Sequence, residues 1–462
     1  MIRIFKQYVP KSVLALGVLD IAVLFAAYYA GYYIRLLELK NVPAAFDERL
    51  GEAAHFVTVL TIAMVALGLY QRDACRDLRV SVSRLMVVFG LSFLWFAMVF
   101  YLIPDISEWR SIFIISYGTS FAGLLINRIL FARLVDLNAL KHRLLVLGAG
   151  ERALRVQGLE TDGLTHGFAV VGFLRMNPRE MTITNAHEFS AVVSLVDFAK
   201  QNHIDEIITA PEERRGALPV RDLLACKLSG IGITDYSTFV ERETGLVDLE
   251  SLDPSWLIYS DGFAAGRFDR AVKRLFDLTV SLGSLFFTLP IFLVAALAIA
   301  LSSRGPIFYQ QKRVGQYGRE FTLLKFRSMK VGAEPKCAPQ WAQENDPRAT
   351  RVGTVLRLTR IDELPQIFNV LKGDMSLVGP RPERPYFVES LTREVPYYSE
   401  RHQVKPGITG WAQLNYPYGA SVEDAKQKLQ FDLYYIKNCG IFMDFLILIQ
   451  TARVILLPEG AR

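Results

Sequence analysis

The chain has 462 residues, which is enough for two or three domains. It is 51% hydrophobic and only 21% charged, with a mean hydropathy of +0.24, so it is too apolar for an ordinary soluble enzyme. The net charge of +6 suits an anionic membrane surface or a phosphate substrate as well as nucleic acid, and the four widely spaced cysteines argue against a disulfide framework or a zinc site.

Four apolar segments in the first third of the chain predict membrane-spanning helices. They cover residues 13–34, 53–70, 85–103 and 112–131. Each is long enough to cross about 30 Å of hydrocarbon. No small-residue cleavage site follows the first segment, so we expect it to be retained in the protein.

The charges beside these segments predict their orientation. Basic residues cluster before the first segment, between the second and third, and after the fourth. The loop between the third and fourth contains Asp105, Glu108 and only one basic residue, Arg110. Because cytoplasmic loops carry the excess of Lys and Arg, we expect a four-helix transmembrane bundle over residues 1–137 with both of its ends in the cytoplasm.

Residues 138–262 alternate short apolar strands with helices, which predicts a Rossmann-like parallel α/β domain. Gly148 and Gly150 follow the first strand, where a glycine-rich turn can cradle a pyrophosphate at a helix N-terminus. The next strand ends at Arg175 and offers no carboxylate for a ribose hydroxyl, which argues against a catalytic NAD site. A structural or ligand-sensing module is the favoured interpretation.

A fifth apolar segment, residues 278–301, is long enough to span a membrane but contains Pro290 in its middle. Basic residues flank both of its ends, among them Arg270 and Arg304, which favours the cytoplasm for both. A re-entrant helix that enters the membrane, breaks at the proline and returns satisfies this, provided that neighbouring groups bind the freed backbone. The alternative is a plain fifth crossing, which would place the polar C-terminal part on the far side of the membrane.

A basic, β-rich stretch follows this segment. Aromatic and β-branched residues alternate there with cations that include Lys325 and Arg327, and glycines mark its turns. The pattern predicts a basic hairpin, which either reaches toward lipid phosphates or lines a pocket for a diphosphate. The stretch alone does not separate these two functions.

Two adjacent carboxylates, Asp362 and Glu363, precede a short predicted helix. Pro365 suits the first position of that helix, and Gly373 suits its end. The positive end of a helix keeps a carboxylate ionised and attracts phosphate. Neighbouring side chains point in different directions, so one acid can attack a phosphorus atom while the other holds a divalent cation. Mg²⁺ suits such a site because it needs few protein carboxylates.

Two arginines strengthen the assignment of this pair to a phosphate site. Arg357 lies five residues before Asp362 on a basic predicted helix, and Arg381 is enclosed by Pro380 and Pro382. Prolines on both sides restrict the backbone, so the guanidinium is preorganised for bidentate binding of a phosphate. An acid pair without such neighbours would more often be a solvated surface or a helix cap.

The motifs "KFRSM", "RIDELPQIFNVLKGDMSLVGPRPE" and "KPGITGWAQLN", in this order, resemble those of the bacterial polyprenyl-phosphate hexose-1-phosphate transferases. The resemblance covers residues 268–462 and implies a catalytic α/β domain over residues 263–462, with the re-entrant helix at residues 278–301. Four N-terminal spans and a Rossmann-like middle domain look like the large, WbaP-like members of that family.

The resemblance implies that Asp362 is the nucleophile and Glu363 a Mg²⁺ ligand. It implies substrate binding by four basic residues: Lys325, Arg327, Arg357 and Arg381. The implied reaction transfers a hexose-1-phosphate from a UDP-sugar to undecaprenyl phosphate and releases UMP, with UDP-glucose as the first choice and UDP-galactose or another UDP-sugar as the alternative. This is the first membrane step of exopolysaccharide, capsule or O-antigen synthesis, in the bacterial cytoplasmic (inner) membrane with the catalytic domain in the cytoplasm.

Two positions depart from the family pattern. Leu289 stands before Pro290 where many members have a serine, so no serine hydroxyl is available there for the broken helix. Arg360 and Ile361 stand before the acid pair where many members have serine and leucine. The extra cation either tunes phosphate binding or is simply solvated.

The remaining motifs carry less information. Trp411 either shapes the sugar or nucleotide pocket or anchors the chain at a membrane interface. Asp432 and Tyr434 lie on a predicted helix and are interpreted as ordinary packing residues. The last apolar run, residues 441–457, contains Asp444 and is expected to lie in the membrane interface rather than to cross it.

Two other functions remain as alternatives. A non-catalytic membrane scaffold or ligand sensor would depend neither on Asp362 nor on a metal. A nucleotide-sugar dehydratase would need a Tyr-x-x-x-Lys pair in the α/β segment, but the one tyrosine between His142 and Ser237, Tyr236, has Val240 at the lysine position. The expected partners are a UDP-sugar, undecaprenyl phosphate and membrane lipid, but not nucleic acid, and a homodimer is left open.

Overall fold

The computed structural model describes residues 2–456 with gaps. The gaps are residues 5–6, 10, 40–48, 72–73, 76, 103–109, 135–140, 162–166, 178–179, 181, 184, 190–193, 213–217, 251, 253–265, 331, 333–347, 418 and 420. The chain forms two compact units, Met1–Thr244 and Gly245–Arg462. The expected domain boundaries at 137/138 and 262/263, and the loop carboxylates Asp105 and Glu108, lie outside the described residues.

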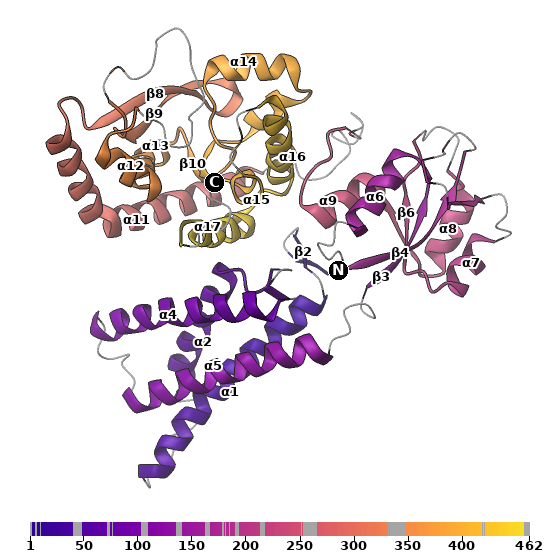
Figure 1. The fold of residues 1–462 in the computed structure, drawn as a ribbon, viewed down its shortest axis with the longest axis horizontal. Helices are drawn as coiled ribbons and strands as arrows, with labels where there is room; N and C mark the ends of the chain where they lie inside the picture. Colours follow the sequence, from indigo (N-terminus) through magenta and orange to yellow (C-terminus); the bar gives the residue numbers. More distant parts are fainter. Residues whose placement is uncertain are drawn as a thin grey trace. The chain divides into compact units, whose positions relative to one another are not determined.

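The N-terminal part of the chain is a helical bundle (Figure 1). Two short antiparallel strands and four helices build it: β1 (Ile2–Ile4), β2 (Gln7–Val9), α1 (Lys11–Leu39), α2 (Leu50–Ala66), α4 (Leu78–Leu102) and α5 (Arg110–Leu134). The four predicted apolar helices are therefore confirmed. By length and composition α1, α4 and α5 can cross a membrane, whereas α2 is a shorter apolar helix of 17 residues.

A buried polar cluster ties the bundle together. The Asp20 carboxylate of α1 is fully buried and accepts hydrogen bonds from Tyr70 Oη (3.0 Å), Asn127 Nδ2 (2.7 Å) and Arg128 Nη2 (2.6 Å). Asn127 and Arg128 lie on α5, and Tyr70 lies just beyond α2. Since apolar helices gain little from burying apolar faces in lipid, polar bonds of this kind decide which faces of the helices meet.

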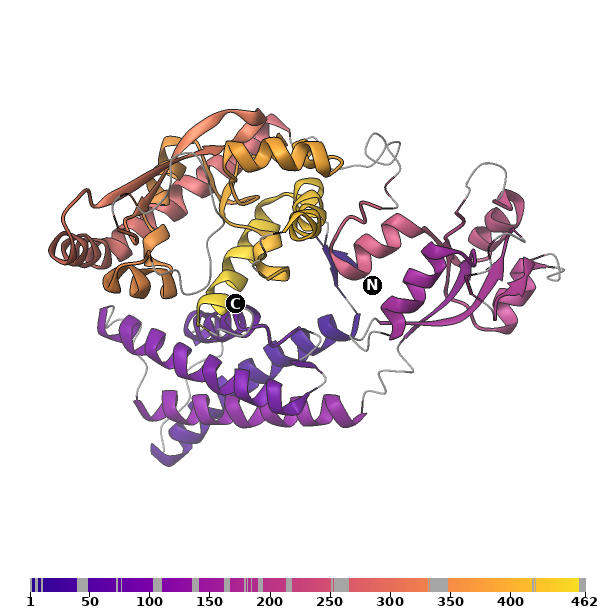
Figure 2. The ribbon, with the colours of Figure 1, turned by 45° about the horizontal axis from the view of Figure 1, so that its top comes forward.

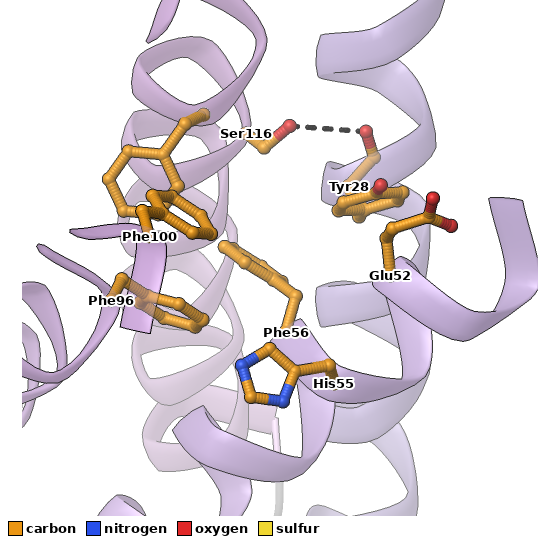
Figure 3. Close-up of a pocket in the computed structure, with 8 residues that line it drawn as sticks. Tyr28, Glu52, His55, Phe56, Phe96, Phe100 and Ser116 are labelled. Atoms are coloured by element: carbon orange, nitrogen blue, oxygen red, sulfur yellow. Dashed lines mark hydrogen bonds between the residues drawn. The ribbon is translucent and has the colours of Figure 1, made fainter. Parts of the chain in front are cut away.

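Aromatic side chains fill the space between α1, α2, α4 and α5, as Figure 3 shows. The rings of Phe56 and Phe96 stack with centroids 5.5 Å apart, and His55 meets Phe96 edge-on. The Ser116 hydroxyl donates to the backbone carbonyl of Tyr28 on the opposite helix. Contacts this close belong to a packed helix interface rather than to a ligand pocket.

The middle part of the chain is an α/β domain built on a five-stranded parallel sheet. The sheet has the order β5-β4-β3-β6-β7. Figure 1 shows α6 and α9 on one side of the strands and α7 and α8 on the other. The elements are β3 (His142–Leu147), α6 (Glu151–Thr161), β4 (Phe168–Arg175), β5 (His187–Glu188), α7 (Leu195–Gln201), β6 (Glu206–Thr209), α8 (Val220–Leu228), β7 (Gly232–Asp235) and α9 (Tyr236–Thr244).

The C-terminal unit combines one long helix, an antiparallel hairpin, a pair of parallel strands and shorter helices. Its elements are α11 (Arg267–Ser302), β8 (Phe308–Val314), η4 (Gln316–Gly318), β9 (Glu320–Phe326), α12 (Arg351–Leu358), η5 (Ile361–Glu363), α13 (Gln366–Lys372), β10 (Ser376–Val378), α14 (Pro385–Glu394), η6 (Tyr398–Gln403), β11 (Gly407–Thr409), α15 (Trp411–Asn415), α16 (Val422–Asn438) and α17 (Ile441–Leu456). Strands β8 and β9 pair antiparallel, and β10 and β11 pair parallel. The predicted basic hairpin is thus present.

Helix α11 has 36 residues and continues through Pro290, so the proline does not end the helix as the sequence led us to expect. Figures 1 and 2 nevertheless draw it as two arms that meet at an angle near the middle. In the first arm Lys273 pairs with Asp444 of α17 at 2.6 Å. In the second arm Phe292 packs on Phe326 of β9, with ring centroids 4.7 Å apart. Both arms therefore pack on the same α/β unit.

The C-terminal unit, Gly245–Arg462, also includes the segment that directly follows α9. Val247 and Leu249 are buried in its main core, which also contains Leu429 and Leu433 of α16. Trp411 Nε1 donates to the carbonyl of Gly245 at 2.8 Å. Trp411 thus anchors the start of this unit, a role that neither of its sequence-based interpretations included.

Candidate active site

The acid pair lies in a tight turn between two helices. Helix α12 ends at Leu358, and Arg360 then takes a left-handed backbone conformation (φ 58°) that turns the chain into η5. Such a conformation is uncommon for a residue other than glycine and is often found at functional sites. The predicted helix is present: it starts at Gln366, with Pro365 at the N-cap and not at the expected first helical position, and it ends before Gly373, which has a φ of 99°. Local sequence signals therefore place both carboxylates at the N-terminal side of α13.

Two cations converge on the second acid of the pair. Lys325 Nζ of β9 and Arg381 Nη2 of the loop after β10 each lie 2.8 Å from Glu363 Oε1. The side chain of Glu363 is 11% exposed, so these ion pairs are shielded from water. Burial of a charged carboxylate costs free energy unless a counter-ion pairs with it, and two cations pair with Glu363 here.

The first acid of the pair has a different environment. Asp362 is only 8% exposed, and its carboxylate accepts no hydrogen bond and forms no ion pair with any residue that the structure describes. Burial raises the pKa of Asp362 and Glu363 adds to this, although Lys325 and Arg360 oppose it. A carboxylate outside ion pairs is a stronger nucleophile than one held in them.

The pKa of Glu363 shifts the other way. Burial alone would raise the pKa of Glu363, but the charges of Arg381 and Lys325 and their hydrogen bonds outweigh it and hold the pKa well below its ordinary value. Glu363 therefore remains ionised throughout the physiological pH range. Two neighbouring acids whose surroundings shift their pKa values in opposite directions are suited to different tasks.

Not every predicted substrate-binding residue forms a bond with Asp362 or Glu363 in the structure. Arg327 is buried and donates from Nη2 to the Ser303 carbonyl at 2.7 Å, so it holds the end of α11. Arg357 lies in the last turn of α12 and makes no side-chain contact with Asp362 or Glu363 among the described residues. Among the described residues, Lys325 and Arg381 are the cations that form ion pairs with Glu363.

The acid pair fits Mg²⁺ only together with phosphate. Among the described residues, no group of three or more His, Cys, Asp or Glu side chains could hold a metal ion. Glu363 binds both of its cations through Oε1, so Oε2 can serve as the kind of oxygen ligand that Mg²⁺ prefers. Because Lys325 and Arg381 already neutralise Glu363, a further dication is favourable there only when diphosphate oxygens add negative charge.

Sequence reasoning missed one buried arginine near the pair. Arg401 lies in η6 and forms an ion pair with Asp432 of α16 at 2.8 Å. Asp432 was expected to be an ordinary packing residue. The one sequence signal is that Arg401 comes shortly before the motif that begins at Lys405.

In the middle domain, carboxylates of the chain itself bind the glycine-rich loop. Ala149 N–H donates to Glu180 Oε2 at 3.1 Å, and Glu151 N–H donates to Glu212 Oε1 at 2.7 Å. A Cβ atom on Gly150 would collide with the carboxylate of Glu212. The carboxylates thus occupy loop amides that bind phosphate in nucleotide-binding domains.

Two protein-family models match the chain. A model described as bacterial sugar transferase matches residues 268–458, which include the acid pair and its cations. A model described as CoA-binding domain matches residues 65–215. The loop at residues 148–151 does not fit the phosphates of CoA, because Glu180 and Glu212 occupy its amides and would repel them.

Several enzymes are similar to this chain. The UDP-N-acetylgalactosamine-undecaprenyl-phosphate N-acetylgalactosaminephosphotransferase of Aeromonas hydrophila is 43% identical over 52% of this chain and 56% of its own length. The UDP-glucose:undecaprenyl-phosphate glucose-1-phosphate transferase of Escherichia coli (strain K12) is 36% identical over 62% of this chain and 61% of its own. The enzyme with the same name in Xanthomonas campestris pv. campestris is 30% identical over 97% of this chain and 95% of its own length. The chain is therefore a membrane enzyme of the bacterial sugar transferase family, the undecaprenyl-phosphate sugar phosphotransferases.

Proposed function

We propose that the protein transfers a hexose-1-phosphate from a UDP-sugar to undecaprenyl phosphate and releases UMP. The observation that carries this proposal is the asymmetry of the acid pair, in which Asp362 lacks a described partner while Glu363 binds Lys325 and Arg381. UDP-glucose is the first choice, since the relative that aligns along 95% of its length is named for that substrate. The product would begin an exopolysaccharide, capsule or O-antigen repeat unit.

The reaction would proceed in two displacements. An Asp362 carboxylate oxygen attacks the sugar-bearing phosphorus of the UDP-sugar, the bond from that phosphorus to the bridging oxygen breaks, and UMP leaves. An oxygen of the lipid phosphate then attacks the same phosphorus and releases the Asp362 carboxylate. Covalent catalysis of this kind divides one displacement between two anions into two easier steps.

The cations beside Glu363 would bind the transferred phosphoryl group. Arg381 presents a planar fork of donors that matches phosphate oxygens, and Lys325 adds a point charge. Glu363 would hold Mg²⁺ when a diphosphate is bound, and the metal would then stabilise negative charge on the phosphate oxygens. Fixed charges of this kind are effective because they need no reorganisation during the reaction.

A direct assay separates this function from the alternatives. Membranes that contain the full-length protein, undecaprenyl phosphate and Mg²⁺ are supplied with one UDP-sugar at a time, and UMP release and lipid-linked product are measured. We expect product from UDP-glucose and less from UDP-galactose or UDP-N-acetylgalactosamine. A scaffold or ligand sensor would release no UMP from any of them.

We further propose that α11 is re-entrant, so that the catalytic domain lies in the cytoplasm at the inner membrane. By length and composition the helix can also cross a bilayer. The support for re-entry is that Lys273 near its start and Phe292 in its second half both pack on the same unit. A straight crossing would carry the second half away from that unit, because each helical residue adds about 1.5 Å.

Cysteine labelling tests this topology. Single cysteines in place of Arg270 and Arg304, in a protein without its native cysteines, should both react only with reagent on the cytoplasmic side. A cysteine at the exposed position Tyr101, beside the expected periplasmic loop, is the control for periplasmic labelling. Labelling of position 304 from the periplasm would show a crossing helix.

We propose that the middle domain is a Rossmann-like module without a dinucleotide cofactor, on the basis of its strand order and its occupied loop amides. Adding NAD or CoA to the purified full-length protein should therefore leave its melting temperature unchanged and should not alter turnover. UDP-glucose is the positive control, since a ligand of the folded state raises the melting temperature. A saturable stabilisation by NAD or CoA would contradict this proposal.

A further inference from the structure

The loop that carries Arg381 is held by an unusual set of bonds. Four successive carbonyl groups, those of residues 380–383, each accept a hydrogen bond, and the donors come from three segments of the C-terminal unit: β11, η6 and the end of β8. The donors, in the order of these carbonyls, are Gly407 N, Arg401 Nη2, Arg313 Nη1 and Val314 N. The two prolines in the loop have no N–H, so their carbonyls are the only backbone groups through which they can form hydrogen bonds.

Arg401 donates directly to the carbonyl of Arg381, the arginine that pairs with Glu363. Its Nη2 lies 3.0 Å from the Arg381 carbonyl and 2.8 Å from Asp432 Oδ2. Its Nη1 donates to Tyr398 Oη at 2.6 Å. One planar guanidinium thus connects α16, η6 and the Arg381 loop, an arrangement that a lysine ammonium cannot reproduce.

The network is buried. Arg401 is 7% exposed and Asp432 is 2% exposed. A charged pair that is merely structural is often no more stabilising than apolar residues of the same volume, because both charges lose their hydration. Here the pair also orients the backbone of a residue whose side chain lies 2.8 Å from Glu363.

We propose that Arg401, oriented by Asp432 and Tyr398, is a positioning residue that fixes Arg381 against the acid pair. Arg401 acts through the Arg381 backbone and does not itself contact Glu363 among the described residues. This inference rests on the proposed function, because it assigns Arg381 to the binding of the transferred phosphate. A displacement of about 1 Å at such a group lowers turnover by about 100-fold.

A double-mutant cycle tests the inference on the full-length enzyme. Arg401→Gln should lower kcat/KM for the UDP-sugar by about 10- to 100-fold. In an Arg381→Ala background the same change should cost no more than about twofold, because its effect passes through the missing guanidinium. Arg401→Lys should not restore the rate, since an ammonium is a compact point charge without the planar fork of donors that holds these acceptors. If the double variant instead loses kcat/KM by the product of the two single fold-losses, the two residues act independently, and the inference is overturned.

A matched variant controls for loss of stability. Arg242 of α9 is a half-buried arginine, also in an ion pair, with Glu206 at 2.8 Å, but it belongs to the other compact unit. Arg242→Gln should lower the melting temperature while its effect on kcat/KM stays within about twofold, both alone and with Arg381→Ala. A loss of activity that merely follows stability would appear in this variant as well.

Hydrogen exchange gives a second readout that needs no substrate. In Arg401→Gln the peptide that spans residues 379–384 should exchange its amide hydrogens about tenfold faster, whereas Arg242→Gln should leave it unchanged. Unchanged exchange in that peptide would refute the positioning role even if the enzyme is active. Conversely, a wild-type protein that forms no lipid-linked product from any UDP-sugar would refute the proposed function, and the exchange experiment would still decide the role of Arg401.

Discussion

Asp362→Asn should abolish the exchange of labelled UMP into UDP-sugar measured without any lipid acceptor. In the covalent route the first displacement is reversible and needs no lipid, so the wild-type enzyme should catalyse this exchange in the absence of an acceptor. The amide has nearly the same shape but cannot attack phosphorus, so both exchange and net transfer should fall by about four orders of magnitude or more. Kinetics of the wild-type enzyme should be ping-pong.

The control for this variant is another acid in the same region. Asp374 follows α13 and pairs with Lys372 at 2.9 Å on the surface. Asp374→Asn should retain exchange and turnover within about twofold, as is usual for surface changes. A wild-type protein that transfers sugar phosphate to lipid but shows no UMP exchange would instead favour direct attack by the lipid, with Asp362 and Glu363 only holding metal.

Glu363→Gln should lower turnover by about 100- to 1,000-fold, and it should change the dependence on Mg²⁺ as well as the rate. The neutral amide leaves Lys325 and Arg381 without their shared counter-ion and offers a weaker ligand to a hard cation. The concentration of Mg²⁺ that gives half-maximal turnover should therefore rise by about 10-fold or more. Turnover measured across a Mg²⁺ titration at saturating UDP-sugar checks both effects.

The same substitution should also reveal the shifted pKa of Glu363. A carboxylate whose pKa is depressed in the folded state stabilises the protein above its unfolded pKa, and this stability is lost as the pH falls. Wild type should therefore be more stable than Glu363→Gln at neutral pH, and the difference should shrink in acid. Glu389 of α14, an exposed acid paired with Arg393, is the control position. An unchanged Mg²⁺ requirement in Glu363→Gln would mean that Glu363 does not hold the metal.

Features with a local cause were predictable from the sequence. The four N-terminal helices follow from runs of apolar residues, whose length and composition need no knowledge of the rest of the chain. The start and end of α13 follow from Pro365 and Gly373, because each residue restricts or frees its own backbone. The position of the acid pair at the N-terminal side of that helix therefore follows from a few neighbouring residues.

The path of α11 was only partly predictable. A proline inside a helix removes one hydrogen bond, and the sequence led us to expect a break at Pro290. The helix instead continues through that position, and its two arms pack on the same unit. Packing of this kind depends on residues far along the chain, such as Asp444, and so it has no local signature.

The different environments of the two acids are a result of tertiary structure alone. Lys325 and Arg381 are 38 and 18 residues from Glu363 in sequence, and nothing near the pair shows that both reach the same carboxylate oxygen. Arg327 has the same charge as Lys325 and lies two residues away, but it follows the last residue of β9 and turns to the end of α11.

The sequence by itself determined the apolar N-terminal helices, the α/β class of the middle domain and the acid pair, because periodicity, hydropathy and turn residues act over a few positions. Only the tertiary structure decided which charges meet. The Glu212 carboxylate at the glycine loop and the Asp432 carboxylate at Arg401 come from 61 and 31 residues away. The chain must fold before such groups become neighbours, and burial then makes their pairing strong enough to set the chemistry of the site.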